Sequence, residues 1–408
     1  MTGRNPIEDL AHLRHEFGEH GGVNMSVEAS STFTVIDPET MPDLFQGRAG
    51  PDKGCYLYGR HFNPTVFNLG RQMAALAGTE AGYCTASGMG AISGVILGLC
   101  NAGDEIVASN AIYGGSYALK HDFLPAKADL HTRFVDITDI DAVRAAITDK
   151  TRLIFTESVS NPTLRLANMP KLSEIAKEKG VKLVVDNTFS PLILSPAALG
   201  ADVVVHSLTK FISGASDVIA GAICGSEEFI GQLMDLHLGS LMLLGPTMDP
   251  NVASAIALRI PHLPLRMNAH SERALAMATR LSELGLKVCY PGLPDHPDHD
   301  SFNELRCEEF GYGGIFTLDV GSEQAANALM SCLQNEQRFG FLAVSLGYFD
   351  TLMSCSGSST SSELSDEDKD SAGISPGLVR ISIGYTGTLE QRWSQLLTAL
   401  HTAGIIDS

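Results

Sequence analysis

Between residues 64 and 265 the chain alternates short β-branched runs with longer segments whose apolar residues recur at helical spacing. Such runs are typical of strands buried on both faces of a sheet, and the longer segments are typical of helices with one apolar face. The pattern predicts strands at 81–85, 105–108, 152–156, 182–186 and 201–205, and helices at 66–76, 89–99, 139–147 and 170–179. This alternation indicates an α/β fold with a largely parallel sheet and helices on both faces.

The two ends of the chain have other patterns. Residues 1–63 are rich in Gly, Pro and charge, which predicts an irregular arm. A long helical stretch near 250–285 leads to a region of α+β type, with strands near 314–320 and 378–383 and helices near 323–333 and 389–403. We therefore expect an arm at 1–63, a large domain at 64–265 and a smaller C-terminal domain at 266–408.

Two stretches within the C-terminal region have a biased composition. Residues 354–362 are mostly serine, and residues 366–370 are mostly acidic. By composition these stretches are typical of a disordered linker.

The bulk composition excludes several classes of function. The chain is 44% hydrophobic, and its net charge of −19 argues against nucleic acid or an anionic membrane surface as a main partner. The sequence contains no apolar run long enough to span a bilayer and no signal-peptide core at its start, so we expect a cytoplasmic protein. The eight scattered cysteines form no C-x-x-C pair, which favours reduced core thiols over disulfides or a zinc site.

The polar residues at two strand ends indicate a cofactor. One run ends at Asp186, and the next passes through Ser207 and Thr209 to Lys210. Ligands of open α/β sheets bind at the edge where parallel strands end. An amine for a Schiff base, a carboxylate for a pyridinium nitrogen and hydroxyls for a phosphate are what pyridoxal 5'-phosphate requires.

Four other positions could complete such a site. Gly88 opens an apolar helix whose N–H groups could hold a phosphate, and Tyr113 follows a strand where its ring could stack on the cofactor. Arg60 could reach a phosphate from the arm, and Arg380 in an alternating strand could bind a substrate carboxylate. Each position has a structural alternative, such as a tight turn at Gly88 or an outward-facing edge position for Arg380.

A dinucleotide-binding fold is the alternative from another class. The glycines at 88, 90 and 94 put the third glycine one position too late for G-x-G-x-x-G. A nicotinamide-dependent oxidoreductase is therefore disfavoured. A catalytically silent pyridoxal-phosphate-binding protein is the third possibility, and the presence of Lys210, Tyr113 and Asp186 together argues against it.

Seven motifs in order resemble the Cys/Met-metabolism, or trans-sulfuration, family of fold-type I pyridoxal-phosphate enzymes. They are Tyr58-x-Arg60-x-x-Asn63-Pro64-Thr65, Ser87-Gly88-Met89-x-Ala91-Ile92, Tyr113-Gly114, Glu157-Ser158-x-x-Asn161-Pro162-Thr163, Asp186-Asn187-Thr188, His206-Ser207-x-Thr209-Lys210 and Gly377-Leu378-Val379-Arg380. The resemblance implies a large domain with a mainly parallel sheet and a smaller α+β C-terminal domain. It also implies a homotetramer built from tight dimers in which the arm completes the neighbour's site.

The resemblance further implies a role for each site residue. Lys210 would bind the cofactor and shuttle protons, Asp186 would pair with the ring nitrogen, and Tyr113 would stack on the ring. The remaining cofactor-binding residues would be Gly88, Met89, Thr188, Ser207 and Thr209, with Tyr58 and Arg60 from a neighbouring subunit. The substrate carboxylate would be bound by Asn161, Ser345 and Arg380. No metal is expected.

Within the family the chain looks closest to the plant-type methionine γ-lyases. Val344 and Leu57 stand where cystathionine γ-lyases carry glutamates, and apolar side chains suit a methyl thioether better than the charged end of cystathionine. The implied reaction is α,γ-elimination of L-methionine to methanethiol, 2-oxobutanoate and ammonia. The alternatives are cystathionine γ-lyase, cysteine desulfhydrase and O-acylhomoserine sulfhydrylase activity.

Two features depart from this family pattern. Gly115 replaces the cysteine that bacterial methionine γ-lyases carry two residues after the stacking tyrosine, and this removes a thiol beside the leaving group. The serine-rich stretch at 354–362 replaces a Met-Thr-His sequence, and the resemblance implies that it packs over the active site.

Overall fold

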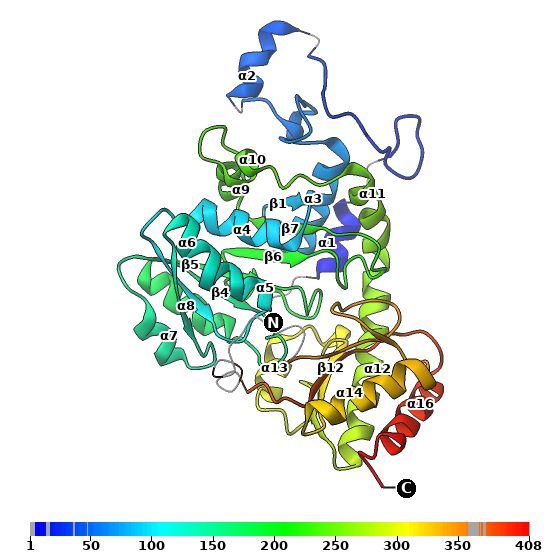
Figure 1. Cartoon of the computed structure of the whole chain (residues 1–408). Coiled ribbons are helices and arrows are strands. Elements are labelled where there is room, and N and C mark those ends of the chain that lie inside the picture. The colour runs from blue at the N-terminus through cyan, green and yellow to red at the C-terminus, as the bar shows by residue number, and fades with distance from the viewer. Residues whose placement is uncertain are drawn as a thin grey trace.

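The computed structural model describes residues 5–13, 17–35, 37–46, 48–357, 367, 369 and 373–407 (Figure 1). It contains a seven-stranded sheet of order β1-β7-β6-β5-β4-β2-β3 and a five-stranded sheet of order β10-β11-β12-β9-β8. The strands of the first sheet are β1 Ala81–Thr85, β2 Glu105–Ser109, β3 His131–Val135, β4 Thr151–Glu157, β5 Lys182–Asp186, β6 Val203–Ser207 and β7 Gly221–Gly225.

The seven-stranded sheet is parallel except at β7. Strand β7 pairs antiparallel with both β1 and β6, while β6, β5, β4, β2 and β3 pair in parallel. The carboxyl ends of β1, β2, β4, β5 and β6 therefore lie at one edge of the sheet. This confirms the predicted α/β fold and its largely parallel sheet.

Helices cover both faces of this sheet because both faces are apolar. Alternate strand residues such as Phe155 and Val184 pack under α4, while Ile154 and Val185 pack with α3 and α8 on the other face. The helices in this region are α3 Pro64–Ala77, α4 Gly88–Leu99, α5 Gly114–Ala118, η3 Leu119–Phe123, α6 Leu124–Ala128, α7 Ile140–Ala146, α8 Met169–Lys179, α9 Glu227–Leu233, α10 Ser240–Leu244 and α11 Pro250–Arg259.

The second sheet has its own apolar core. Its strands are β8 Lys287–Cys289, β9 Ile315–Asp319, β10 Phe341–Leu342, β11 Leu352–Cys355 and β12 Leu378–Ser382. The helices of this part of the chain are α12 Leu263–Glu283, α13 His299–Leu305, η5 Glu308–Phe310, α14 Glu323–Ser331, η6 Cys332–Glu336 and α16 Leu389–Thr402. Apolar residues of α12, α14 and α16 pack with β9 and β12, which confirms the predicted α+β character.

The predicted helix at 250–285 is interrupted. The chain forms α11, then the short 3-10 segment η4 Ile260–His262, then α12. Pro261 lies within η4, and a proline lacks the N–H that a continuous α-helix requires at that point. The two helices nevertheless run on from one unit to the other, as the green-yellow ribbon of Figure 1 shows.

The first 63 residues contain short helices joined by irregular segments. These are α1 Pro6–Leu13, η1 Pro38–Thr40, α2 Met41–Phe45 and η2 Pro51–Lys53. Helix α1 packs against α3, whereas the segment that carries α2 projects from the rest of the chain in Figure 1. The division at residues 63 and 265 stays a prediction.

Two sequence expectations need correction. Strands β3 and β7 were not predicted, because β3 begins with three polar residues and β7 begins and ends in glycine. The reading of 354–362 as a linker is wrong at its start, since Ser354 and Cys355 belong to β11 and Ser356 is also buried. Residues 358–366, 368 and 370 lie outside the described residues.

The described part of the chain has no helix that is both long and apolar enough to cross a membrane. This agrees with the expectation from the hydropathy pattern.

Two buried histidines make the stability of the fold depend on pH. Burial lowers the pKa of both His206 on β6 and His270 on α12 to about 4. The unfolded chain takes up these protons near pH 6.5, whereas the folded chain does so only near pH 4. The contribution of each residue to stability is therefore complete above pH 6.5 and is lost as the pH falls through 4.

We predict that His206→Asn flattens the dependence of the unfolding free energy on pH between 6.5 and 4. The neutral folded state of His206 contributes up to about 3 kcal/mol of this dependence. Urea titrations at fixed protein concentration measure the slope. Substitution of the exposed His237 by Asn serves as the control and leaves the slope unchanged. An unaltered slope in His206→Asn would contradict the assignment.

Candidate active site at the edge of the parallel sheet

Three polar side chains lie together where β4, β5 and β6 end. Glu157 is paired in register with Asp186, and Ser207 ends the next strand. Alternation along the strands puts all three on the face that α4 covers, because they follow Phe155, Val184 and Val205 by two residues. The register of the sheet therefore brings two carboxyl groups and a hydroxyl to one corner.

The start of α4 provides an anion-binding corner. The side chain of Ser87 caps the helix by accepting a hydrogen bond from the Gly90 N–H, at 3.0 Å. Among the described residues, no hydrogen bond engages the N–H groups of Gly88 and Met89. A Cβ at Gly88 would lie only 2.9 Å from the Cβ of Ser207. Glycine is thus required for the helix start to lie this close to β6, where its free N–H groups and dipole favour a phosphate.

Asp186 is a buried carboxyl group with local support. The Thr188 N–H and hydroxyl both donate to its Oδ1, at 3.0 and 2.5 Å. Burial raises the pKa of Asp186, while these two hydrogen bonds oppose the shift. Within the described residues no hydrogen bond engages Oδ2, so this oxygen is available to a cation.

Lys210 lies in the turn after β6 and is held by the C-terminal part of the chain. Its Nζ donates to the Ser345 Oγ at 2.9 Å. Burial, with a smaller contribution from the charge of Arg380, lowers the pKa of Lys210 to about 8. A substantial fraction of the amine is therefore neutral near pH 8, which is the form that acts as a nucleophile or base.

Arg380 connects the second sheet to the first. Its guanidinium is buried and donates to the Asn161 Oδ1 at 3.0 Å and to the Ser345 carbonyl at 3.1 Å. Burial lowers the pKa of Arg380 to about 10, which leaves it charged at neutral pH. The alternative that Arg380 faces outward on an edge strand is excluded. Its geometry suits bidentate binding of a carboxylate.

Glu157 is a functional candidate that the sequence analysis left without a role. Its carboxylate accepts hydrogen bonds from the Tyr113 N–H at 2.8 Å and from the Asn161 N–H at 3.0 Å. It thereby fixes the backbone at two of the predicted site residues. The sequence did give one signal for Glu157, which is its place at the end of a predicted strand. The structure adds that Glu157 lies opposite Asp186 on the neighbouring strand.

Gly115 determines where the Tyr113 ring can lie. A Cβ at Gly115 would lie 2.6 Å from the Tyr113 Cε1. The ring of Tyr113 is about half exposed, so it borders the open side of the site. A cysteine at position 115 would require the ring to lie elsewhere.

Three predicted cofactor residues have other partners in the single chain. The Thr209 hydroxyl is hydrogen bonded to the backbone of Ala220, and the Arg60 guanidinium donates to the Met242 carbonyl at 3.0 Å. Tyr58 is exposed and has Arg60 beside its ring. No hydrogen bond within the described residues joins Tyr58 or Arg60 to the group around Lys210.

A cavity of about 610 Å³ opens beside Lys210. Its lining includes Ser345, whose hydroxyl binds the lysine, and Thr209 from the same turn. The other lining residues are Ser216, Asp217, Val218, Ile219, Phe341, Ala343, Tyr348 and Leu352.

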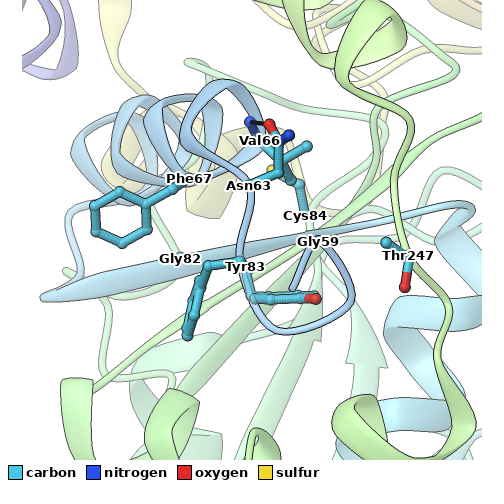
Figure 2. Close-up of a pocket in the computed structure, with 9 residues that line it drawn as sticks. Gly59, Asn63, Val66, Phe67, Gly82, Tyr83, Cys84 and Thr247 are labelled. Atoms are coloured by element: carbon cyan, nitrogen blue, oxygen red, sulfur yellow. Dashed lines mark hydrogen bonds between the residues drawn. The ribbon is translucent and has the colours of Figure 1, made fainter. Parts of the chain in front are cut away.

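A second hollow, shown in Figure 2, lies between the start of α3 and strand β1. It holds only about 10 Å³ and is lined by residues such as Asn63, Val66 and Tyr83. This volume is about that of one water molecule, so the hollow is a packing gap and not a substrate site.

Comparison with known proteins identifies the family. Residues 10–391 match the family described as Cys/Met metabolism PLP-dependent enzyme. The chain belongs to this family. It is 59% identical over 392 residues to methionine gamma-lyase of Arabidopsis thaliana, covering 96% of this chain and 89% of that protein. It is 34% identical over 394 residues to L-methionine gamma-lyase of Pseudomonas putida, covering 94% of this chain and 95% of that protein.

Solved structures of family members share the fold. A putative O-acetylhomoserine (thiol)-lyase from Campylobacter jejuni has a TM-score of 0.89 at 26% identity, covering 97% of this chain and 100% of that chain. Cystathionine gamma synthase from Xanthomonas oryzae, in complex with cystathionine, has a TM-score of 0.87 at 32% identity, covering 99% of both chains. The predicted fold-type I architecture is confirmed, and the dinucleotide-dependent alternative is wrong.

The predicted cofactor is also confirmed. The family is PLP-dependent, and the Campylobacter jejuni structure contains a pyridoxyl-lysine monophosphate residue. The residues of this chain fit that group, because they combine a partly buried lysine, a buried carboxyl group and a helix start with free N–H groups. No cluster of His, Cys, Asp and Glu that could hold a metal occurs in the residues that the structure describes.

We predict that Gly88→Ala weakens binding of pyridoxal 5'-phosphate about tenfold or more while the apoprotein still folds. The added methyl group would push the start of α4 away from Ser207 and separate the groups that face the phosphate. Titration of apoprotein with the cofactor measures the dissociation constant. Gly231→Ala on α9 is a matched control, because a Cβ there meets nothing within 4 Å. Unchanged affinity in Gly88→Ala would show that the close approach is not needed.

Proposed function

We propose that this protein is a carbon–sulfur lyase that catalyses α,γ-elimination of L-methionine. One water molecule is consumed, and the products are methanethiol, 2-oxobutanoate and ammonia. The observation that carries the proposal is the apolar wall beside the lysine, together with 59% identity to a methionine gamma-lyase.

The apolar wall suits a methyl thioether. Ile219, Phe341 and Leu352 line the cavity that contains the Ser345 hydroxyl, and Val344 is 70% exposed directly before this serine. An uncharged chain such as that of methionine can lie against this surface without losing hydration of a charged end. The ammonium and carboxylate at the far end of cystathionine would gain no charged partner from Val344.

The substrate carboxylate would bind to Arg380 and Asn161. The guanidinium carries a positive charge in a buried place, and its contact with the Asn161 amide keeps its plane fixed. Ser345 would contribute through its backbone and hydroxyl, since these already contact Arg380 and Lys210. This anchoring would orient the Cα–H bond of the substrate toward the lysine.

Lys210 would act first as the attachment point of the cofactor and then as the proton carrier. Once the substrate amine takes its place, the free lysine would remove the proton from Cα and then assist proton loss at Cβ. When bound, pyridoxal phosphate supplies an electron sink that accepts the electron pair left at Cα. The lowered pKa of Lys210 favours both roles near pH 8.

Tyr113 would stack on the cofactor ring and donate a proton to the leaving methanethiolate. Its backbone is fixed by Glu157, and its ring lies over Gly115. Asp186 would pair with the ring nitrogen through Oδ2, supported by Thr188. Gly88, Met89, Ser207 and Thr209 would hold the phosphate.

We further propose a homotetramer of tight dimers in which Tyr58 and Arg60 serve the neighbour's site. Exposed leucines on the single chain support this proposal, because another subunit could cover them in the assembly. Leu238, Leu243, Leu244, Leu258 and Leu265 are each more than half exposed and lie on or near α10, α11 and α12. A cytoplasmic location, an arm at 1–63 and domains at 64–265 and 266–408 stay predictions.

We predict that the purified enzyme converts L-methionine to methanethiol and 2-oxobutanoate in equal amounts. Lys210→Ala should lower turnover by several orders of magnitude, because it removes the group proposed to carry the proton at Cα. Quantification of both products from the same incubation is the measurement. Absence of both products from a cofactor-loaded enzyme would favour cystathionine, cysteine or an acylated homoserine as the substrate.

We predict that Val344→Glu lowers kcat/KM for methionine about tenfold and raises cleavage of cystathionine. A carboxylate at this place disfavours the methyl thioether and attracts the distal ammonium of cystathionine. Competition assays with both substrates measure the ratio. Val344→Gln has nearly the same size without the charge and should show little gain on cystathionine. An equal gain in both variants would contradict the electrostatic explanation.

A further inference from the structure

The most unusual group outside the assigned site is a completely buried lysine. Lys120 lies in η3, the π-helical turn between α5 and α6, and its exposed fraction is 0%. Lysine is almost never fully buried unless it is paired, because removing an ammonium from water is costly. The steps proposed above give this residue no task, although π-helical turns often occur at functional sites.

The direct contacts of Lys120 do not account for its burial. Its Nζ donates to the Ser116 carbonyl at 3.3 Å and lies 3.4 Å from the centre of the Phe155 ring. An ammonium has three donors and a full charge, and one carbonyl with one aromatic face only partly replaces its hydration. A compensating negative charge is expected nearby.

The sheet places two carboxyl groups beside this ammonium. Phe155 precedes Glu157 by two residues on β4, so their side chains lie on the same face. Asp186 is opposite Glu157 in the parallel register and shares that face. The ammonium on the Phe155 ring therefore lies on the same face of the sheet as the two carboxyl groups, and the charge of each of them raises its pKa against the effect of burial.

Two adjacent buried carboxyl groups repel each other when both are charged. Burial and the charge of Asp186 raise the pKa of Glu157, so this pair tends to hold a proton. A protonated Glu157 would accept the Tyr113 and Asn161 N–H groups more weakly than a carboxylate does. Glu157 therefore holds the backbone of Tyr113 and Asn161 most firmly when a nearby positive charge keeps it ionised.

We propose that Lys120 is a positioning residue whose buried ammonium keeps Glu157 and Asp186 both ionised in the cofactor-bound enzyme. Asp186 is then free to pair with the protonated ring nitrogen, and Glu157 retains its two backbone hydrogen bonds. With the cofactor bound, the carboxylates of Glu157 and Asp186 are balanced by the Lys120 ammonium and the protonated ring nitrogen. Neither carboxylate then needs to bind a proton. The inference rests on the proposed place of the ring beside Asp186 and not on methionine as substrate.

The other titratable groups around this cluster are few. Glu157 on β4 and Asp186 on β5 face Lys120 from the sheet. Arg380 on β12 and Tyr113 before α5 interact electrostatically with one another, and Arg380 also interacts with Glu157. The neighbours of Lys120 on its own turn, His121 and Asp122, are exposed and paired with each other.

The test is a double-mutant cycle with Lys120→Met and Glu157→Gln, read out without substrate. One measurement is the dissociation constant of pyridoxal 5'-phosphate for each apoprotein. The other is the infrared band of a protonated carboxyl group in each cofactor-loaded protein at pH 6.5, where Lys120 is mostly charged although burial lowers its pKa to about 7. Lys127→Met on α6 removes an exposed lysine close by and serves as the control.

We expect Lys120→Met to raise the dissociation constant at least about tenfold and to show the protonated carboxyl band. The double variant should lack this band and should bind the cofactor within about threefold of the wild type, because the excess negative charge is gone. Lys127→Met should match the wild type in both measurements. If Lys120→Met does not fold while the double variant does, the same compensation is shown through stability.

The proposal would be overturned if the losses of cofactor affinity in Lys120→Met and Glu157→Gln simply added in the double variant. A double variant that binds the cofactor no better than Lys120→Met would mean that the lysine only fills space. Lack of the carboxyl band in a folded, cofactor-loaded Lys120→Met protein would also overturn it. Failure of the protein to act on methionine would leave both measurements unaffected, so the two proposals can fail separately.

Discussion

The parallel register of β4, β5 and β6 is the constraint on which the site depends. It aligns Glu157 with Asp186 and ends the next strand at Ser207 on the same face of the sheet. Because α4 covers this face and begins at Gly88, a helix start comes to lie against the strand end. A shift of one residue in any of these strands would turn its polar end to the opposite face.

Residues of the C-terminal sheet region complete the candidate site that begins at the edge of the large sheet. Arg380 on β12 and Ser345 before the second sheet's β11 reach Asn161 and Lys210 on the large sheet's side. The hydrogen bonds that reach Asn161 and Lys210 join residues more than a hundred positions apart in the chain. The proposed substrate pocket therefore lies where two separate apolar cores meet, as binding sites of α/β enzymes commonly do.

Charge compensation is local and opposite to the charge of the whole chain. The net charge is −19, yet the site gathers Lys210, Arg380 and Lys120 around two carboxyl groups. Burial lowers the pKa of each of these three cations, so their neighbours determine how much of each stays charged. A local excess of cations can attract an anionic cofactor and an amino-acid carboxylate even though the whole chain is acidic.

The sequence by itself determined five of the seven strands of the large sheet, its longer helices and the candidate residues at the strand ends. β-branched runs ending at Asp186 and near Lys210 predicted both the sheet and its active edge, because buried parallel strands have a strong local pattern. Tertiary structure alone decided the rest. Strand β7 exists because β1 and β6 offer it hydrogen bonds, although its glycines give no strand signal. The bonds that Glu157 makes to Tyr113 and Asn161, and the burial of Lys120, depend on contacts between distant segments, and no local pattern of side chains encodes such contacts.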